Sequence, residues 1–239
     1  MSFKLFCSLL CTVFLLPVSA FSNEQNSIDT TTLYIGKFSS HQLTPWKEKS
    51  FHGNTNYSII TDSALSPPTQ VLKAISKASA SGLFFKKRID IQKTPWLHWS
   101  WKTTKLFSHM DETQKSGDDF VARLYIIIDG GLFFWDTHAL NYVWSSSHPQ
   151  GETWHNPYTS NATMFAIESG NKHLGQWQYY TRNVYEDVKK LTGKDVKYID
   201  AIAIMTDSDN TSQQATTYYG DIYLTAQNKK GSLMAPFKK

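Results

Sequence analysis

Carboxylate and amide side chains gather between two apolar runs late in the sequence. Asp207, Asp209 and Asn210 follow the run 198–206, and Asp221 lies within the next run, 218–224. Oxygen ligands at short spacing suit calcium, a hard cation, so these four residues are a candidate calcium site. The glycine and late glutamate of an EF-hand loop are missing, and Asp and Asn also cap turns of their own backbone. Calcium binding and an ordinary turn are therefore both open interpretations.

A second polar group stands just before the most apolar run, 124–129. It contains Asp118, Asp119 and Arg123. Asp119 and Arg123 lie at even spacing, so in a strand they would share a face. An arginine that enters a buried strand needs a carboxylate partner, which favours a structural ion pair. The alternative is a ligand-binding arginine, because its fork suits carboxylates, phosphates and sugar diols.

Paired carboxylates can also hydrolyse glycosidic bonds. The candidates are Asp118, Asp119, Asp207 and Asp209, although spacing along the chain does not reveal the separation of their carboxyl groups. The sequence contains no His-Glu-x-x-His motif, no Gly-x-Ser-x-Gly elbow and no glycine-rich phosphate loop before a helix. These absences favour a non-enzymatic protein and leave a hydrolase as the alternative.

The elements that would position these residues are mostly strands. In the run 96–102, Leu97, Trp99 and Trp101 share one apolar face that is predicted to meet the core. One helix is predicted over 183–191, with Asn183 as N-cap, Glu186 at the capping-box position and Gly193 after its end. The runs 198–206 and 218–224 are predicted as neighbouring strands, and 145–160 as a long loop. About ten strands and one short helix predict an all-β fold, an antiparallel β-sandwich of jelly-roll type.

This fold makes a prediction about the two acidic regions. If the strands at 120–128 and 199–206 are antiparallel neighbours, the start of one and the end of the other lie at the same end of the sheet. Carboxylates gathered there repel one another unless an arginine or a bound cation compensates. The sequence thus predicts one polar cluster of Asp119, Arg123, Asp207 and Asp209 at one end of the sandwich. Arg182 is an additional candidate for this cluster.

The beginning of the chain predicts export. Lys4 precedes an apolar stretch from Leu5 to Leu16, and Val18-Ser19-Ala20 is typical of a cleavage site, so 1–20 is predicted as a signal peptide. Both cysteines fall inside it. Residues 21–31 are predicted to be flexible, 32–226 to form a single domain and 227–239 a basic tail. We expect a periplasmic or secreted protein without a membrane span once the signal peptide is removed.

Composition narrows the range of ligands. The net charge is only +4 and the basic residues are dispersed, which argues against nucleic acid because that partner requires a basic face. Aromatic residues make up 14% of the chain and include eight Trp. Such side chains fill cores, but they also stack on sugar rings.

Seven motifs stand in order along the chain, at 80–83, 97–101, 117–123, 142–144, 181–187, 205–211 and 219–222. Together they resemble a bacterial family of exported proteins, domain-of-unknown-function family 3047. The resemblance extends from about Leu33 to Leu224 and implies no particular activity. The closing Asp221-Ile222 strand is also similar to galactose-binding-like jelly-roll domains, a likeness of fold alone.

Three functional hypotheses follow. The first is a non-enzymatic module that binds carbohydrate or another cell-envelope ligand, as export, aromatic content and the sandwich pattern suggest. The second is a hydrolase or lyase that acts on polysaccharide through its aspartates. The third is a scaffold for another exported protein, which would expose a large apolar patch.

Overall fold

A computed structural model describes residues 32–108, 110–128, 137–193 and 195–228. The predicted signal peptide, the segment 21–31 and residues 229–239 of the basic tail lie outside these ranges. The described residues form fourteen strands, one α-helix and two short 3-10 helices, η1 (Phe38–Ser40) and η2 (Lys115–Gly117). Within the same ranges, no helix has the length and apolar character that a bilayer span requires.

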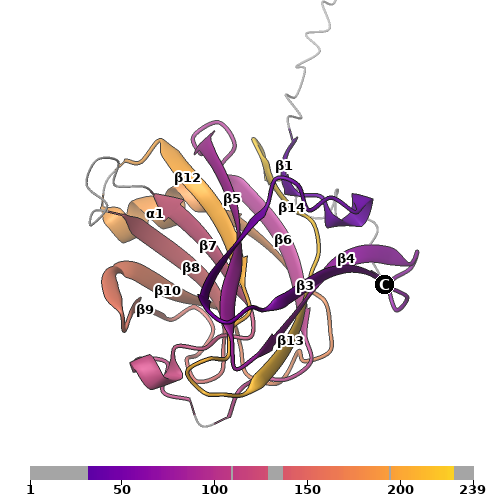
Figure 1. Ribbon diagram of the computed structural model, residues 1–239. Helices are drawn as coiled ribbons and strands as arrows, with labels where there is room; N and C mark the ends of the chain where they lie inside the picture. Colours follow the sequence, from indigo (N-terminus) through magenta and orange to yellow (C-terminus); the bar gives the residue numbers. More distant parts are fainter. Residues whose placement is uncertain (1–31, 109, 129–136, 194, 229–239) are drawn as a thin grey trace, which may run out of the picture.

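The strands form two sheets that face each other (Figure 1). The described part of the first sheet has the order β1-β14-β6-β13-β4-β3. In addition, β11 pairs with β6 outside this order. Its strands are β1 (Thr32–Gly36), β3 (Asn56–Asp62), β4 (Thr69–Lys77), β6 (Trp96–Thr103), β11 (Gln178–Asn183), β13 (Gln214–Tyr219) and β14 (Ile222–Thr225).

The second sheet has the order β2-β5-β12-β7-β8-β10-β9 among the described residues. The pairing of β8 with β10 is parallel, and the other pairings described in both sheets are antiparallel. This confirms the predicted β-sandwich and adds one parallel pair. The strands are β2 (Lys47–His52), β5 (Ala80–Asp90), β7 (Arg123–Ile128), β8 (His138–Ser145), β9 (Thr153–Asn156), β10 (Thr159–Ser169) and β12 (Tyr198–Met205).

The core between the sheets is rich in aromatic rings. Leu97, Trp99 and Trp101 are buried in it, which confirms the face predicted from the alternation in β6. Trp99 stacks on Tyr142 of β8 and on Tyr180 of β11, with ring centroids 5.1 Å apart in both pairs. The aromatic residues of β6 therefore serve mainly to join the two sheets.

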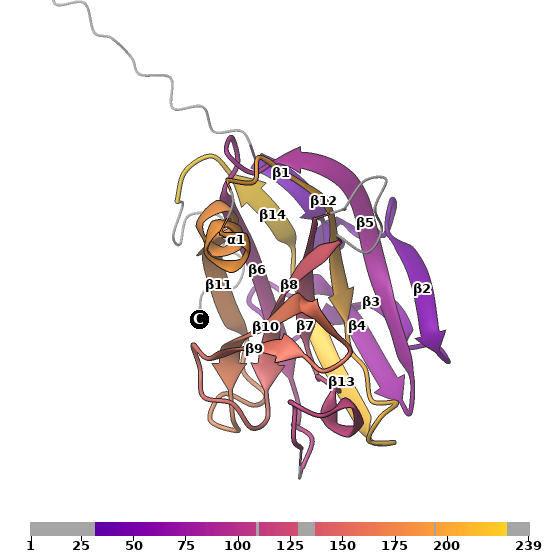
Figure 2. The same cartoon turned by 90° about the vertical axis from the view of Figure 1, so that its left-hand side faces the viewer.

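The predicted helix is confirmed as α1 (Val184–Thr192), which lies beside β11 (Figure 2). The Asn183 side chain accepts a hydrogen bond from the Glu186 backbone N–H at 3.1 Å, as an N-cap does. Gly193 ends the helix in the left-handed region, with φ of 65°. Glycine adopts this left-handed conformation without strain because it has no Cβ atom.

Two sequence predictions about the strands are wrong, one about which strands are neighbours and one about a segment predicted as a loop. The runs 198–206 and 218–224 are not neighbours, because β12 belongs to the second sheet while β13 and β14 belong to the first. The chain crosses from one sheet to the other between them, so no hairpin joins the two runs. The segment 145–160 is also more than a loop, since β9 lies within it and pairs with β10.

The pairing of β7 with β12 is the feature that positions the site. The two strands are antiparallel, and Arg123 at the start of β7 lies opposite Met205 at the end of β12. The residues before β7 and the residues after β12 therefore meet at the same end of the second sheet, as predicted.

Removing the ring of Trp99 should destabilise the fold strongly. We expect Trp99→Ala to lower the free energy of unfolding by about 3–5 kcal/mol, because the substitution leaves a cavity between two stacked tyrosines. Phe51→Ala is the matched control, since Phe51 is 57% exposed and its loss should cost no more than about 0.5 kcal/mol. Urea denaturation measures both values, and equal losses would contradict the assignment of Trp99 to the core.

Candidate functional site

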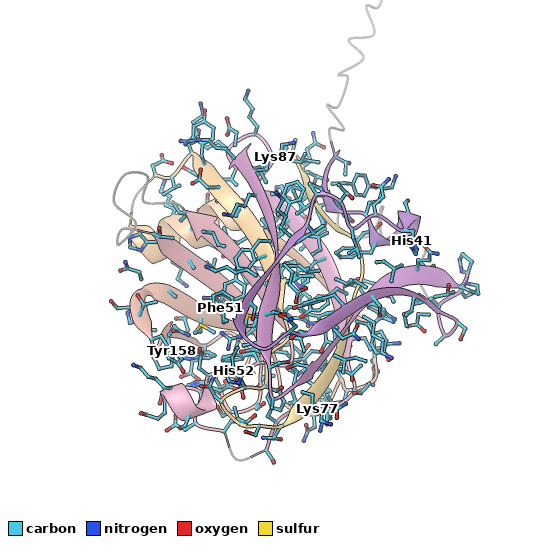
Figure 3. All side chains as sticks on the ribbon, in the orientation of Figure 1. His41, Phe51, His52, Lys77, Lys87 and Tyr158 are labelled. Atoms are coloured by element: carbon cyan, nitrogen blue, oxygen red, sulfur yellow. The ribbon has the colours of Figure 1, made fainter. Side chains whose placement is uncertain are left out.

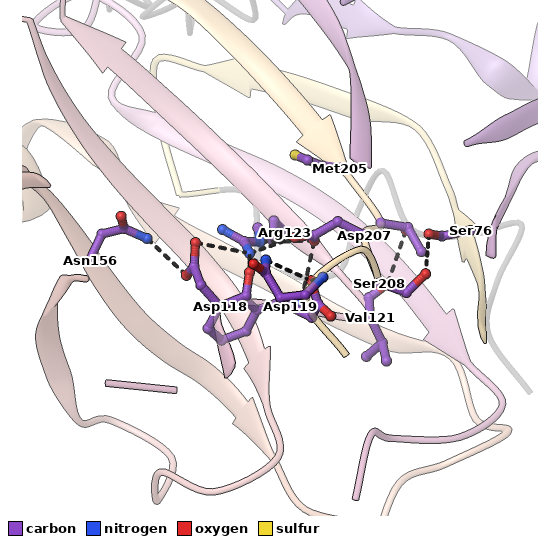
Figure 4. A network of polar contacts seen from close by, with 12 residues as sticks. Ser76, Asp118, Asp119, Val121, Arg123, Asn156, Met205, Asp207 and Ser208 are labelled. Carbon is purple, nitrogen blue, oxygen red and sulfur yellow. Dashed lines mark hydrogen bonds and ion pairs between the residues drawn. The ribbon is translucent and has the colours of Figure 1, made fainter. Parts of the chain in front are cut away.

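A buried ion pair between Arg123 and Asp207 lies at the centre of the site (Figure 4). Arg123 Nε donates to Asp207 Oδ1 at 3.0 Å, and Nη2 donates to Oδ2 at 2.6 Å. Arg123 is 3% exposed and Asp207 is 2% exposed. Two parallel hydrogen bonds of this kind fix the orientation of both groups as well as their charge.

The rest of the guanidinium is also engaged. Nη1 donates to the Tyr125 hydroxyl at 3.3 Å, and Nη2 donates to the Asp118 carbonyl oxygen. Nη2 also lies 3.6 Å from Asp118 Oδ2. Burial acts against the charge of Arg123, but the carboxylates of Asp118 and Asp207 outweigh it and raise the pKa of the guanidinium. Arg123 is thus a fixed cation inside the protein.

Asp119 has a different role from the one predicted. Its Oδ1 accepts from the backbone N and from Nδ2 of Asn210, both at 3.2 Å, and its Oδ2 accepts from Thr211 N at 2.6 Å. Asp119 precedes the first residue of β7, so the argument from a shared strand face does not apply to it. The carboxylate holds the loop after β12, while Asp118 and Asp207 are the ion-pair partners of Arg123.

Two residues singled out in the sequence lie elsewhere. Arg182 is paired with Asp187 of α1, with Nε 2.8 Å from Oδ2, and is absent from the cluster. Asp221 accepts from the backbone N and from Oγ of Ser39, at 2.8 Å and 2.6 Å. The missing hairpin explains this second error, because Asp221 follows a strand of the other sheet.

The predicted four-residue calcium set is therefore not assembled. Asp119, Asp207 and Asp209 do bring carboxylate oxygens within 4.8 Å of one another. An ion among them would share Asp207 with the Arg123 guanidinium. Asn210 also contributes its backbone N–H and side-chain amide to Asp119. Calcium at this cluster stays a hypothesis, now without Asp221.

The cluster carries more negative than positive charge. Asp118 and Asp207 pair with the guanidinium of Arg123, and carboxylate oxygens of Asp119 and Asp209 lie within 4.8 Å of one of Asp207. Burial, followed by repulsion from Asp119, raises the pKa of the Asp209 carboxyl. Burial also raises the pKa of Asp118, although Arg123 opposes it. The folded protein therefore holds protons at this end of the sheet more firmly than the unfolded chain does.

A cavity of about 430 Å³ opens over the cluster. Tyr125, Asn141 and Met205 form part of its lining, from β7, β8 and β12. Their neighbours Leu124, Leu140 and Ile204 belong to the core between the sheets. Because side chains alternate along a strand, the cavity lies on the outer face of the second sheet.

Two exposed aromatic rings stand at the cavity. Phe51 of β2 is 57% exposed and Tyr158, between β9 and β10, is 55% exposed, and both line the cavity. They lie on the same side of the molecule, away from Lys87 (Figure 3). The Tyr158 hydroxyl donates to Asn210 Oδ1 at 2.9 Å, and Asn156 Nδ2 donates to Asp118 Oδ1 at 2.8 Å. These bonds tie the rim to the acidic cluster.

Phe51, Tyr158 and Asn141 are site residues that no motif in the sequence marks. Only Tyr158 carries a weak signal, because it lies in the segment 145–160, which contains His, Pro and Asn residues and is predicted as a long loop. Phe51 belongs to an edge strand with the polar sequence KEKSFH, which has no alternation pattern to reveal it.

The facing sheets and the cavity on one outer face define an all-β sandwich protein with a candidate binding site. The chain belongs to the family described as protein of unknown function (DUF3047), which matches residues 44–223. This membership confirms the resemblance found in the motifs. No curated protein matches the chain.

Solved structures with a similar arrangement include three carbohydrate-binding modules. A family 30 module of a Clostridium thermocellum cellulosomal cellulase has 9% identity and a TM-score of 0.48, covering 83% of this chain and 99% of that chain. A family 11 module from the same organism, in complex with a β-1,3-1,4-mixed-linked tetrasaccharide, has 12% identity and a TM-score of 0.44, covering 81% and 94%. TmCBM61, in complex with β-1,4-galactotriose, has 8% identity and a TM-score of 0.40, covering 80% and 97%. These similarities are too low to transfer the role of any residue.

Removing the guanidinium should unfold this end of the protein. We expect Arg123→Met to lower the free energy of unfolding by about 3–5 kcal/mol, because it leaves the Asp207 carboxylate buried without a partner. Replacing Asp207 by Asn in the same chain should restore part of the loss, and chemical denaturation of both variants tests this.

The exposed pair of Arg88 and Asp200 provides the control, since the Arg88 side chain is 68% exposed. Arg88→Met should cost at most about 1 kcal/mol. A loss at Arg123 no larger than that at Arg88 would contradict the central role of the buried pair.

Asp209→Asn should stabilise the protein at neutral pH. The raised pKa of Asp209 means that its contribution to stability is lost as pH rises through the folded-state pKa. The amide removes the repulsion from Asp119, so the melting temperature should rise at pH 7 and the gain should shrink as pH falls toward the ordinary carboxyl pKa. Asp200→Asn, which removes a carboxylate paired with Arg88, should show no such gain. A lower melting temperature for Asp209→Asn at pH 7 would contradict this charge balance.

Proposed function

We propose that this protein is an exported, non-enzymatic module whose outer-face cavity binds carbohydrate. The observation that carries the proposal is the position of Phe51 and Tyr158 at a cavity with fixed polar groups. Exposed aromatic rings offer an apolar face to a sugar ring, and the polar groups fix its hydroxyls. A volume of about 430 Å³ lies within the range of small-ligand sites, about 300–1,000 Å³.

The exposure of these two rings has no role in folding. Among the described residues, the large apolar side chains that remain exposed are Tyr34, Phe51 and Tyr158. Two of the three line the same cavity, although they come from elements more than one hundred residues apart in the sequence. Such convergence favours a binding role for the cavity rim. It also disfavours the scaffold hypothesis, which requires a broad exposed apolar patch.

The contacts of the aspartates favour binding over hydrolysis. A glycosidase needs two carboxyl groups that face the scissile bond, one as acid and one as base or nucleophile. Asp207 is held by Arg123, Asp119 by the loop backbone, and Asp118 by Asn156 and Arg123. Asp209 interacts with Asp119 and His52 rather than with an arginine or lysine. The cluster therefore serves as a rigid support for the cavity.

Export rests on the pattern of residues 1–20, with its basic start, apolar stretch and small-residue cleavage sequence. A location outside the cytoplasm would bring the cavity into contact with cell-envelope or environmental polysaccharides. These polymers are the ligand class we assign to it.

A glycan array followed by calorimetry tests the proposal. Once an oligosaccharide ligand is found, Tyr158→Ala and Phe51→Ala should each weaken binding by about tenfold, since an aromatic contact contributes about 0.5–1.5 kcal/mol beyond its buried area. Their melting temperatures should stay close to that of the parent protein.

Tyr34→Ala is the matched control, because Tyr34 is 40% exposed and does not line the cavity. It should leave affinity unchanged. An array without any ligand, or equal losses from Tyr34→Ala and Tyr158→Ala, would contradict the assignment of the cavity as a carbohydrate site.

A further inference from the structure

The hydrogen-bonding groups of the cavity show which kind of sugar it suits. Most donors at the cavity are already committed to the protein. Asn156 Nδ2 donates to Asp118, and Asn210 N and Nδ2 donate to Asp119. Arg123 donates through Nε, Nη1 and Nη2 to Asp207, Tyr125 and the Asp118 carbonyl oxygen. A ligand rich in acceptors would therefore find few free donors.

One buried acceptor at the cavity has no hydrogen-bond partner. Asn141 is 1% exposed and lines the cavity, and its Oδ1 has no hydrogen-bond partner. Its amide Nδ2 donates to the Thr163 carbonyl oxygen at 3.4 Å. That carbonyl can only accept, so the amide nitrogen must face it and Oδ1 must face away. A buried acceptor without a donor is costly unless a partner supplies one.

Asp209 adds a charged acceptor to the same cavity. It lines the cavity, forms no ion pair with a lysine or arginine among the described residues, and interacts with Asp119 and His52. Asp118, Asp207 and Asp209 contribute three carboxylates to the lining, and Arg123 contributes the compensating guanidinium. The surplus of negative charge repels an acidic group and attracts a cation.

The aromatic rings of Phe51 and Tyr158 also attract cations. Lys49 Nζ lies 5.0 Å from the Phe51 ring centroid, and Lys115 Nζ lies 5.1 Å from that of Tyr158. Both ring faces thus already attract an ammonium group. The two lysines are exposed and surrounded by water, where their charge is screened. The carboxylates of Asp118 and Asp207 are buried, so their field dominates inside the cavity.

We infer that the cavity selects a sugar with a free, protonated amine, such as a glucosamine unit, over N-acetylated and acidic sugars. The amine would donate to Asp209 and the adjacent hydroxyls to Asn141 Oδ1, while the ring lies against Tyr158. This inference rests on the proposed carbohydrate-binding function and specifies its ligand class.

Calorimetry at physiological salt with three tetrasaccharides tests it: β-1,4-linked glucosamine, its N-acetylated form and oligogalacturonate. We expect the glucosamine oligomer to bind at least about tenfold more tightly than the N-acetylated one, a factor of ten being about 1.4 kcal/mol. The galacturonate oligomer should not bind. Physiological salt screens non-specific attraction between exposed charges.

Variants then locate the preference. Asp209→Asn should reduce the ratio of the two affinities, because it removes the acceptor assigned to the amine. Asn141→Ala should weaken both oligomers alike, because both carry the hydroxyls assigned to its Oδ1. Asp200→Asn, at a residue that does not line the cavity, should change neither affinity. The melting temperature of each variant shows that it is folded.

The outcomes distinguish the inference from the function on which it rests. Tighter binding of the N-acetylated or galacturonate oligomer at this cavity would overturn the inference and leave the carbohydrate-binding function standing. A preference for glucosamine that survives Asp209→Asn unchanged would also overturn it. If none of the three oligomers binds and the glycan array also shows no ligand, both the inference and the carbohydrate-binding function are overturned.

Discussion

The buried pair of Arg123 and Asp207 is the interaction on which this end of the protein depends. It links the first residue of β7 to the loop after β12, at 3.0 Å and 2.6 Å. Through Nη2 the same guanidinium also fixes Asp118. Burying either charge without the other would be costly. The segment before β7 and the loop after β12 must therefore adopt the one arrangement that keeps the two side chains paired. That arrangement sets the positions of Asn156, Asn210 and Tyr158, which are bonded to it in turn.

The pair also explains how polar groups can line a cavity on the face of a sheet without weakening it. Each carboxylate beside Arg123 is held by a defined donor, so the cavity keeps its shape before a ligand arrives. Preorganisation of this kind reduces the entropy lost on binding. The aromatic rim has the opposite character, since Phe51 and Tyr158 are exposed on an edge strand and a turn, so a bound ligand would restrict their side chains.

Much of this arrangement was predictable from the sequence, because local patterns determined it. The alternation in β6 identified the buried tryptophans, the capping residues identified α1, and two apolar strands flanked by acidic residues predicted the cluster of Asp119, Arg123, Asp207 and Asp209. The errors concern pairings between distant elements. Nothing local shows that β12 and β13 belong to different sheets, so Asp221 was placed with the wrong residues. The rim was missed for the same reason, since the approach of Phe51 to Tyr158 depends on strand order across the whole second sheet.

A crystal structure with a bound oligosaccharide tests the central claim most directly. The account predicts a sugar ring against Tyr158, in the cavity on the outer face of the second sheet, with the Arg123–Asp207 pair intact beneath it. A ligand whose own acidic group replaces Asp207 on the guanidinium, or a ligand bound away from this cavity, would contradict the account.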